Sequence, residues 1–409
     1  MDDDELIPHL FRTEYRKIVS VLCKHFGFAQ IEIAEDIASE TFLTATQSWG
    51  IEGLPKNPTA WLYNVAKNKA KNFLQRKTIF DKKIAPAIRN ADDAEPMADV
   101  DLSPQNINDS QLAMMFAVCH PALPQEAQIG LQLRILCGFG IEEIATAFLS
   151  NKETINKRLF RAKEKLREEK ISIELPAETD IDNRLEPVLR TIYLLFNEGY
   201  YSTSKDKILR RELCFEAMRL CTMLVENKAT NKPQVNALLS LMCFHASRFD
   251  ARLNEQGEII LYEEQDTTLW NTDLISKGAY FLHNAASGKV LSKYHLEAGI
   301  AYWNTQKEDT KEKWENILQF YNRLLQIEYS PVAALNRTYA LAKANSKEDA
   351  IIEAEKLQLT ENHFYFTLLG ELYTGKDNIK AKRHFTQAIT LAKTQADKQA
   401  ILKKMDKLS

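Results

Sequence analysis

The stretch SNKETINKRLFRAKEKLREEK (residues 150–170) concentrates positive charge on one predicted helix, although the 409-residue chain as a whole has a formal net charge of −3. Helical spacing predicts one apolar stripe along this helix, made of Ile155, Leu159, Ala162 and Leu166. The neighbouring stripe is polar and mostly basic, and it consists of Thr154, Lys157, Arg158, Arg161 and Lys165. Ser150 and Glu153 fit a capping box, which predicts that the helix begins directly after Ser150.

The segment just upstream, IEEIATAFL (141–149), predicts a second amphipathic helix. Two short helices joined by a tight turn, the second basic on its exposed side, are typical of a helix-turn-helix that binds DNA. The other interpretation is a solvated helix face with ion pairs between successive turns, which is common for runs of charge. The local pattern leaves both interpretations open.

The whole chain is expected to be all-α and to form two or three domains. It contains only 13 glycines and 12 prolines, and runs of alternating apolar and polar residues are nearly absent. The acidic start, MDDDELIPHL, does not resemble a signal peptide, and no apolar run approaches membrane-spanning length, so a cytoplasmic location without membrane attachment is expected. The six cysteines lack a C-x-x-C pair, so we expect small buried residues of a reduced protein and no metal site.

Composition divides the chain into four parts. Residues 5–77 are expected to be helical, residues 78–110 to form a flexible acidic linker, residues 111–170 to be helical, and residues 184–409 to form a helical C-terminal extension. Repeats are expected at about 293–405, because Tyr339 and Tyr373 are separated by the tetratricopeptide period. An unrelated pair of helical hairpins is the alternative.

A second candidate for nucleic-acid binding is the stretch NPTAWLYNVAKNKAKNFLQRK (57–77). Amide side chains and lysines share one face of this predicted helix, and they suit a surface that contacts both phosphates and base edges. Trp61 lies at the edge of that face, where it either stacks on an unpaired base or packs in the core. The face consists of Asn64, Lys67, Asn68, Lys71 and Asn72.

The helix predicted before it, AEDIASETFLTATQSW (34–49), carries acidic residues on its exposed side. An acidic face beside a basic one suggests a protein partner for the first and nucleic acid for the second, although a solvated acidic face is the simpler interpretation. The exposed polar residues are Glu35, Asp36, Ser39 and Glu40.

Together these motifs resemble regions 2 and 4 of the sigma-70 family, in the extracytoplasmic-function (ECF) subfamily, in which a short linker joins the two regions. The resemblance rests on EDIASETFLTA, on GLPKNPTAWLYNVAKNKAKNFLQRK and on the helix pair that ends in NKRLFRAKEKLRE. It implies that Asp36 and Glu40 dock on the β′ clamp of core RNA polymerase, with the β flap as a second contact. It also implies that the Asn/Lys helix, with Trp61, binds the −10 promoter element. The −35 element would bind Lys152, Thr154, Lys157, Arg158, Arg161 and Lys165.

The segments FAVCHPAL (116–123), IYLLFNEGYYSTS (192–204) and LYEEQDTTLW (261–270) resemble the group of these sigma factors that has a long tetratricopeptide-like extension. Gly199 fits the C-cap of a helix, and the residues Asn197, Glu198, Gly199 and Tyr200 form either a regulatory contact or ordinary packing. We expect the extension, with a possible partner or ligand, to control whether regions 2 and 4 adopt their polymerase-bound arrangement. An activating role is favoured over an inhibitory one.

The sequence favours neither an enzyme nor a cofactor-binding protein. It contains no Gly-rich phosphate loop, no Ser/His/Asp or Cys/His set and no metal-ligand spacing. The alternative function is a regulator of duplex DNA, or a repeat scaffold, that does not engage polymerase. That alternative explains the helix pair and the repeats, but it does not explain the Asn/Lys helix beside an acidic one.

Overall fold

The computed structural model of the protein describes residues 3–84, 100–201, 207–252, 260, 262–393 and 395–408. Within these ranges every regular element is a helix and no strand occurs, so the predicted all-α class is confirmed. The chain divides into two compact units, Met1–Thr230 and Asn231–Ser409.

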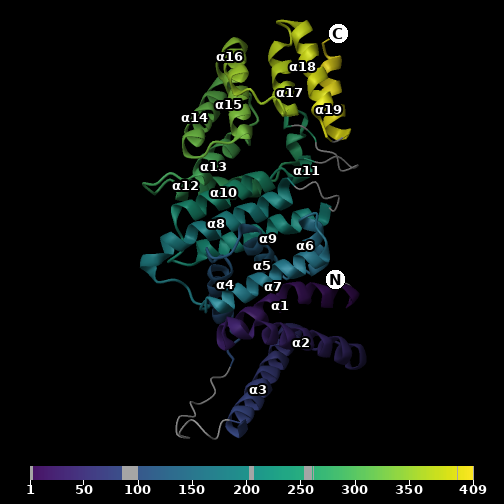
Figure 1. Ribbon diagram of the computed structural model, residues 1–409, viewed down its shortest axis with the longest axis vertical. Coiled ribbons are helices and arrows are strands. Elements are labelled where there is room, and N and C mark those ends of the chain that lie inside the picture. The colour runs from purple at the N-terminus through teal and green to yellow at the C-terminus, as the bar shows by residue number, and fades with distance from the viewer. Residues whose placement is uncertain are drawn as a thin grey trace. The chain divides into compact units, whose positions relative to one another are not determined.

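The first unit opens with three long helices, α1 (Asp3–Phe26), α2 (Ile31–Glu52) and α3 (Pro58–Ile84), and a short 3-10 turn, η1 (Phe28–Gln30), precedes α2 (Figure 1). Helix α2 packs with both of its neighbours through a buried face of small and aromatic side chains that includes Ala34, Phe42 and Trp49. At the start of α3 the Asn57 side chain accepts a hydrogen bond from the Ala60 amide at 3.0 Å, which caps the helix.

The helices α4 (Pro104–Val118), α5 (Gln125–Leu131), α6 (Ile141–Ala147) and α7 (Lys152–Glu168) follow, with one π-helical turn, η2 (Gln132–Leu136), after α5. The predicted apolar stripe of α7 is confirmed, because Ile155, Leu159, Ala162 and Leu166 are all buried. The predicted linker 78–110 is shorter at both ends, since α3 continues to Ile84 and Ser103 caps α4 ahead of Pro104. The predicted flexibility falls mainly on residues 85–99, outside the described ranges.

The predicted capping box at Ser150 is wrong by one residue. Asn151 caps α7 instead, because its side chain accepts a hydrogen bond from the Thr154 amide at 2.8 Å. Ser150 belongs to the end of the preceding helix, where its amide donates to the Ala145 carbonyl at 2.8 Å. Leu149 has a left-handed backbone (φ 48°), which closes α6 before α7 begins.

Two further helices, α8 (Glu178–Tyr201) and α9 (Lys207–Glu226), pack against each other and complete the first unit. The predicted C-cap at Gly199 is wrong, because α8 continues through this residue to Tyr201. The predicted extension 184–409 is therefore divided: α8 and α9 belong to the same unit as α1–α7, and the rest forms the second unit.

The second unit consists of helices that run back and forth in antiparallel pairs (Figure 1). The segment 293–405, where repeats are predicted, includes two helical hairpins, α15 (Pro331–Ala344) with α16 (Lys347–Leu357) and α17 (His363–Tyr373) with α18 (Asn378–Leu391). Ala350 in the first hairpin and Ala381 in the second are fully buried. Their assignment as tetratricopeptide-like repeats stays a prediction. The elements are α10 (Pro233–Ala246), α11 (Phe249–Arg252), η3 (Tyr262–Glu264), η4 (Thr267–Leu269), α12 (Thr272–Ala285), α13 (Lys293–Trp303), α14 (Lys311–Ile327), α15 (Pro331–Ala344), α16 (Lys347–Leu357), α17 (His363–Tyr373), α18 (Asn378–Leu391) and α19 (Gln395–Asp406).

Candidate nucleic-acid interface

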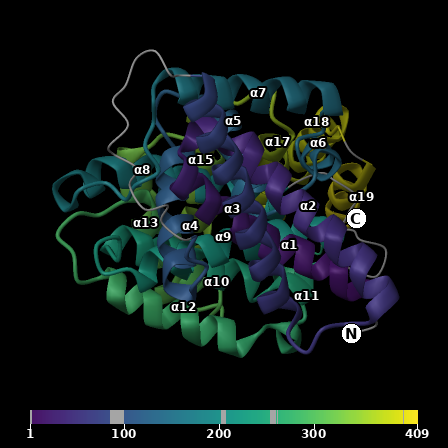
Figure 2. The same ribbon diagram turned by 90° about the horizontal axis from the view of Figure 1, so that it is seen from below.

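Helix α7 presents part of its predicted basic stripe to solvent. Thr154, Lys157 and Arg161 are exposed, and Figure 2 shows α7 at the outer edge of the first unit. Arg158 is only half-exposed, because it pairs with Glu126 at 2.7 Å and lies over the Phe148 ring.

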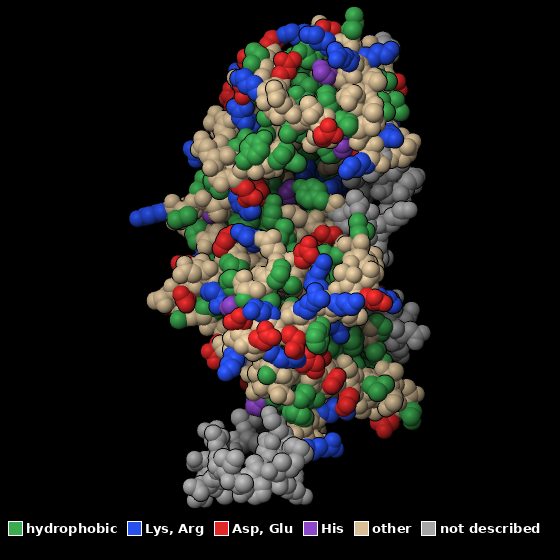
Figure 3. All heavy atoms as spheres, viewed as in Figure 1, with side chains coloured by type: hydrophobic (Ala, Val, Ile, Leu, Met, Phe, Trp, Pro, Cys, Tyr) green, Lys and Arg blue, Asp and Glu red, His purple; other side chains and the backbone are tan. Residues whose placement is uncertain are grey.

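The remaining cations predicted to bind the −35 element, Lys152 and Lys165, form ion pairs with nearby residues. Lys165 pairs with Glu169 at 2.8 Å one turn further along α7. Lys152 pairs with Glu142 on α6, and this contact joins the two helices of the predicted helix-turn-helix. In the view of Figure 3, Lys and Arg side chains accordingly lie next to Asp and Glu side chains in the part of the first unit where α7 and α1 are seen. The ion-pair interpretation therefore holds for Lys152, Arg158 and Lys165, and DNA binding by the exposed residues of the helix stays a prediction.

The predicted Asn/Lys face of α3 is exposed at four of its five positions. Trp61 is half-buried and packs edge-on against Trp49, with 5.3 Å between ring centroids, so part of its surface belongs to the core of α1–α3. Lys67 is also half-buried, whereas four residues of the face are exposed to solvent: Asn64, Asn68, Lys71 and Asn72. These four residues form a continuous polar surface of amides and one lysine.

The acidic face of α2 divides into two sets that point in different directions. Asp36 and Glu40 are exposed, and Glu40 pairs with Lys69 of α3 at 3.2 Å. Leu43, one turn further along α2, is 58% exposed and adds an apolar side chain to this surface. Leu43 was not predicted as part of this surface, although its spacing from Asp36 and Glu40 places it on the same face of the helix.

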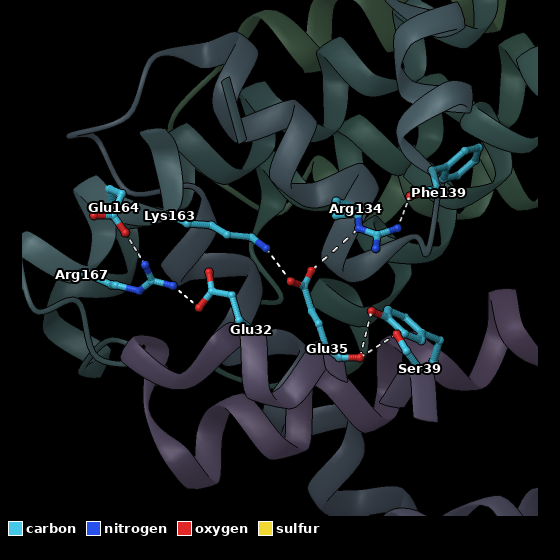
Figure 4. Close-up of polar contacts among 9 residues, drawn as sticks. Glu32, Glu35, Ser39, Arg134, Phe139, Lys163, Glu164 and Arg167 are labelled. Atoms are coloured by element: carbon cyan, nitrogen blue, oxygen red, sulfur yellow. Dashed lines mark hydrogen bonds and ion pairs between the residues drawn. The ribbon is translucent and has the colours of Figure 1, made fainter. Parts of the chain in front are cut away.

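The second set, Glu32 and Glu35, binds cations of helices that lie far away in the sequence (Figure 4). The Glu35 carboxylate accepts a hydrogen bond from Lys163 of α7 at 2.6 Å, and Arg134 of η2 lies 3.8 Å from its other oxygen. The side chains of Glu35 and Lys163 are only 15% and 13% exposed. The predicted exposure of Glu35 is therefore wrong, because η2 and α7 cover this side of α2.

A second ion pair reinforces this contact. Arg167 of α7 binds both Glu32 of α2 and Glu164 of its own helix. The nearby Tyr15 lies under the Arg134 guanidinium, and burial, aided by the Glu35 charge, raises the pKa of its hydroxyl to about 12. Burial likewise raises the pKa of the Cys23 thiol, and the charge of Glu35 raises it further. Both groups are neutral and buried. Their low hydration strengthens the attraction between the charges of the neighbouring ion pairs.

A third cross-connection involves helix α9. Glu216 accepts hydrogen bonds from Arg16 of α1 at 2.6 Å and from Arg219 at 2.8 Å. Arg219 in turn donates to the backbone carbonyl of Leu136 in η2 at 2.7 Å. Burial alone would raise the pKa of the Glu216 carboxyl, but the two arginines outweigh this and hold its pKa below the ordinary value.

Helix α8 is joined to α4 and α5 by neutral and charge-assisted hydrogen bonds. Arg184 donates to the Phe116 carbonyl at 3.1 Å, and the Thr191 hydroxyl donates to the side chain of Gln128 at 2.9 Å. Of the residues predicted as a regulatory contact, Asn197 and Glu198 are half-buried and Gly199 and Tyr200 are buried. Tyr200 stacks on Phe196, which favours ordinary packing over a regulatory contact for Gly199 and Tyr200.

The described residues contain no helix that is long and apolar enough to cross a membrane. Among the same residues, no group of three or more His, Cys, Asp or Glu side chains is arranged to hold a metal ion. All six cysteines are free and buried, as the sequence predicts.

Comparison with known proteins agrees with this geometry. The model of Sigma-70 region 2 matches residues 10–79, which include most of α1, all of α2 and most of α3. The ECF RNA polymerase sigma-E factor of Haemophilus influenzae is 32% identical over 135 residues, which cover 32% of this chain and 70% of that protein. The RNA polymerase sigma-H factor of Pseudomonas aeruginosa is 29% identical over 181 residues, which cover 42% of this chain and 83% of that protein. The chain therefore belongs to the sigma-70 family of RNA polymerase sigma factors.

The similarity also extends over the C-terminal half. A family of unknown function, DUF6596, matches residues 184–286. An uncharacterised protein of Rhizobium meliloti is 30% identical over 388 residues, which cover 93% of this chain and 91% of that protein. No solved structure matches the chain.

Proposed function

We propose that this protein is a sigma factor of the ECF type, which binds core RNA polymerase and directs it to promoters from within the cytoplasm. The observation that carries the proposal is the solvent-exposed Asn/Lys face of α3, because this face lies inside the match to Sigma-70 region 2. Amides and lysines on one helix face suit contacts to phosphates and to bases. The face, with Trp61 at its edge, binds the −10 element through Asn64, Lys67, Asn68, Lys71 and Asn72.

The exposed acidic side chains of α2 are the proposed docking site for core polymerase. Asp36 and Glu40 provide negative charge for a basic surface of the β′ clamp, and the exposed Leu43 adds apolar contact area. The ion pair between Glu40 and Lys69 orients this surface relative to α3. In this arrangement one side of the three-helix region 2 binds protein and another binds DNA.

The helices α4–α7, called the region 4 segment from here on, are the proposed reader of the −35 element, with the β flap as their polymerase contact. Helix α6, the turn of residues 148–151 and helix α7 are spaced as in a helix-turn-helix. Similarity to the two sigma factors extends over more residues than the region 2 match alone, which supports this assignment. Thr154, Lys157 and Arg161 are the exposed contacts. Phosphates would compete with the paired glutamates for Lys152, Arg158 and Lys165.

The C-terminal extension is proposed to regulate the two DNA-binding regions. Its helical hairpins in the second unit offer a surface for a regulatory partner or ligand, as stacked tetratricopeptide-like units do. Its first helices, α8 and α9, contact the region 4 segment directly. No catalytic residue, metal or cofactor is part of the proposal.

Binding to core polymerase separates this function from that of a DNA regulator or a repeat scaffold. The purified chain is mixed with core RNA polymerase and passed over a gel-filtration column. We expect it to elute with polymerase, and we expect Asp36→Arg and Glu40→Arg to elute separately. A wild-type chain that never co-elutes with polymerase would favour the regulator or scaffold.

A further inference from the structure

The last two helices of the second unit carry a surplus of positive charge that contrasts with the rest of the chain. Residues 375–409 contain nine Lys and Arg side chains and three Asp side chains, a surplus of six positive charges, whereas the whole chain has a formal net charge of −3. Helix α18 contains three of these cations and no Asp or Glu. The ion pairs between successive turns that usually neutralise a charged helix face therefore cannot form within α18.

The cations gather at one end of the α18/α19 hairpin. Helix α19 begins soon after α18 ends at Leu391, so the two helices run antiparallel and the start of α18 lies beside the end of α19. Figure 3 shows Lys and Arg side chains at this end of the second unit, where the C-terminus lies in Figure 1. We call this cluster the C-terminal basic surface, and it consists of the exposed residues Lys380, Lys382, Arg383, Lys403 and Lys407.

Most of this positive charge is not compensated within the protein. Lys380 is only weakly engaged, because its Nζ lies 4.0 Å from Asp377 and above the Tyr373 ring. Burial lowers the pKa of the neighbouring His384, and the charge of Arg383 lowers that pKa further, as expected in an electropositive environment. Four side chains form no ion pair and no hydrogen bond within the part of the chain that the structure describes: Lys382, Arg383, Lys403 and Lys407.

Helix stability does not explain the cations of α18. Lys380, Lys382 and Arg383 lie close to the start of this helix, where the helix dipole favours negative charge and disfavours cations. Lys403, in contrast, lies in the last turn of α19, where the dipole favours a cation. The charges on α18 therefore suit an anion that is supplied from outside the protein.

The chemistry of the C-terminal basic surface favours nucleic-acid phosphates over a protein partner. Lysine is depleted in protein–protein interfaces, whose centres are apolar, whereas lysine and arginine neutralise phosphates in protein–DNA interfaces. The exposed amide of Gln387 on α18 adds a neutral donor of the kind that also contacts phosphate oxygens. The expected contact is electrostatic and independent of base sequence.

The order of the chain indicates which DNA lies within reach. Helices α8 and α9 contact the region 4 segment through Arg184 and Arg219, and the second unit follows directly, with α10 beginning at Pro233. In the proposed function the region 4 segment binds the −35 element, and region 2 binds the promoter on its downstream side. The duplex upstream of −35 is left for the second unit. Attachment to the region 4 segment raises the effective concentration of this DNA, so a few phosphate contacts are enough for binding.

We propose that the C-terminal basic surface binds the phosphate backbone of promoter DNA upstream of the −35 element. This is a third DNA contact, beside those of region 2 and the region 4 segment, and it rests on the proposed function. It gives a role to helices that lie beyond the match to the family of unknown function, which ends at residue 286. Such a contact increases promoter affinity, in the activating direction that the sequence favours for the extension.

DNA binding is tested first with the free, full-length chain. A labelled duplex of about 30 base pairs without promoter elements is titrated at several salt concentrations. The test variant combines Lys382→Gln, Arg383→Gln and Lys403→Gln. The matched control removes the same charge from three exposed lysines elsewhere in the second unit, by Lys277→Gln, Lys289→Gln and Lys307→Gln.

We expect the test variant to bind the duplex at least about tenfold more weakly than the wild type, because three phosphate contacts are lost. The slope of the logarithm of affinity against the logarithm of salt concentration should decrease by about 2–3 units, at about 0.9 unit for each lost contact. The control variant should bind like the wild type. Equal affinity and equal salt dependence of the test and control variants would overturn the inference.

The position of the contact is tested by cross-linking in the holoenzyme. Thr386→Cys on α18 and Ser276→Cys on α12 place exposed cysteines for a photoreactive maleimide, because all six native cysteines are buried. The promoter fragment extends about 35 base pairs upstream of the −35 element, or roughly three helical turns. We expect cross-links from the Thr386→Cys variant to DNA upstream of −35 and none from the Ser276→Cys variant.

These experiments separate failure of the basic surface from failure of the proposed function. If the chain does not bind core polymerase, the sigma-factor proposal fails, while titration of the free chain still tests the basic surface. Cross-links to a polymerase subunit and none to DNA would overturn the inference in favour of an acidic protein partner. Tighter binding to vesicles of phosphatidylserine and phosphatidylcholine than to the duplex would overturn it in favour of a membrane surface. Circular dichroism of each variant shows whether its helices are retained.

Discussion

The carboxylate of Glu216 lies 2.6 Å from the guanidinium of Arg16, although 200 residues separate them in the sequence. Both side chains are largely buried, so removal of the carboxylate leaves an uncompensated charge in the interior of the first unit. We expect Glu216→Ala to lower the free energy of unfolding of this unit by about 3–5 kcal/mol. Urea titration monitored by hydrogen exchange in peptides of α1 measures the loss.

The matched control is Glu226→Ala, because Glu226 is exposed on the same helix. It should change the free energy of unfolding by no more than about 0.5 kcal/mol. Equal effects of the two substitutions would show that the Arg16–Glu216 pair makes no net contribution to stability.

The Glu216 carboxylate should make the stability of the first unit depend on pH. The pKa of Glu216 in the folded protein lies below its ordinary value of about 4.3, because the two arginines outweigh the effect of burial. Its contribution to stability is therefore complete above about pH 4.3 and is lost as the pH falls through the folded pKa. The stability difference between the wild type and Glu216→Gln should shrink between pH 6 and pH 3. A difference that stays constant over this range would contradict the assignment of the charge.

The exposed and the paired cations of α7 should differ in their effect on promoter binding. Arg161→Ala should weaken binding to a −35 element by about 1–3 kcal/mol if Arg161 contacts a base edge. If it contacts phosphate, the loss should be similar for all sequences and the salt dependence should fall by about one unit. Arg158→Ala should have a smaller effect, because Arg158 already pairs with Glu126.

These effects are measured by titration of labelled duplexes with the holoenzyme at several salt concentrations. If neither Arg161→Ala nor Lys157→Ala changes binding, α7 does not lie in the DNA interface. If Arg158→Ala has the larger effect, the pair with Glu126 opens in the complex and Arg158 takes the central role.

Substitutions on α3 of region 2 should affect promoter melting without affecting polymerase docking. Asn68→Ala and Lys71→Ala alter exposed side chains of α3 and should leave core binding unchanged, because Asp36 and Glu40 lie on another helix. Both substitutions should reduce the permanganate reactivity of unpaired thymines near the −10 element. Normal melting by both variants would remove this face of α3 from the −10 contact.

Local patterns predicted the elements of this protein well, because helical periodicity depends on residues a few positions apart. The apolar stripe of α7 and the Asn/Lys face of α3 both follow from spacing alone. The cap of α7 was misplaced by one residue, because the left-handed backbone at Leu149 assigns Ser150 to the end of α6. The predicted helix end at Gly199 was also wrong, because α8 and its buried side continue beyond this residue.

The tertiary contacts could not be predicted from one sequence. Glu35 and Asp36 are neighbours with the same charge, yet only Glu35 is covered, and the residue that binds it is 128 positions away on α7. Nothing in the spacing of α2 distinguishes the two carboxylates. The pairing of Glu216 with Arg16 spans 200 positions and is likewise set by the placement of the helices and not by local spacing.

The most direct measurement is run-off transcription with core RNA polymerase over a library of promoter fragments, with and without the full-length chain. The account predicts transcripts that depend on the chain and whose start sites lie downstream of a shared pair of −35 and −10 elements. Core polymerase that gains no chain-dependent transcripts from any fragment would contradict the assignment as a sigma factor.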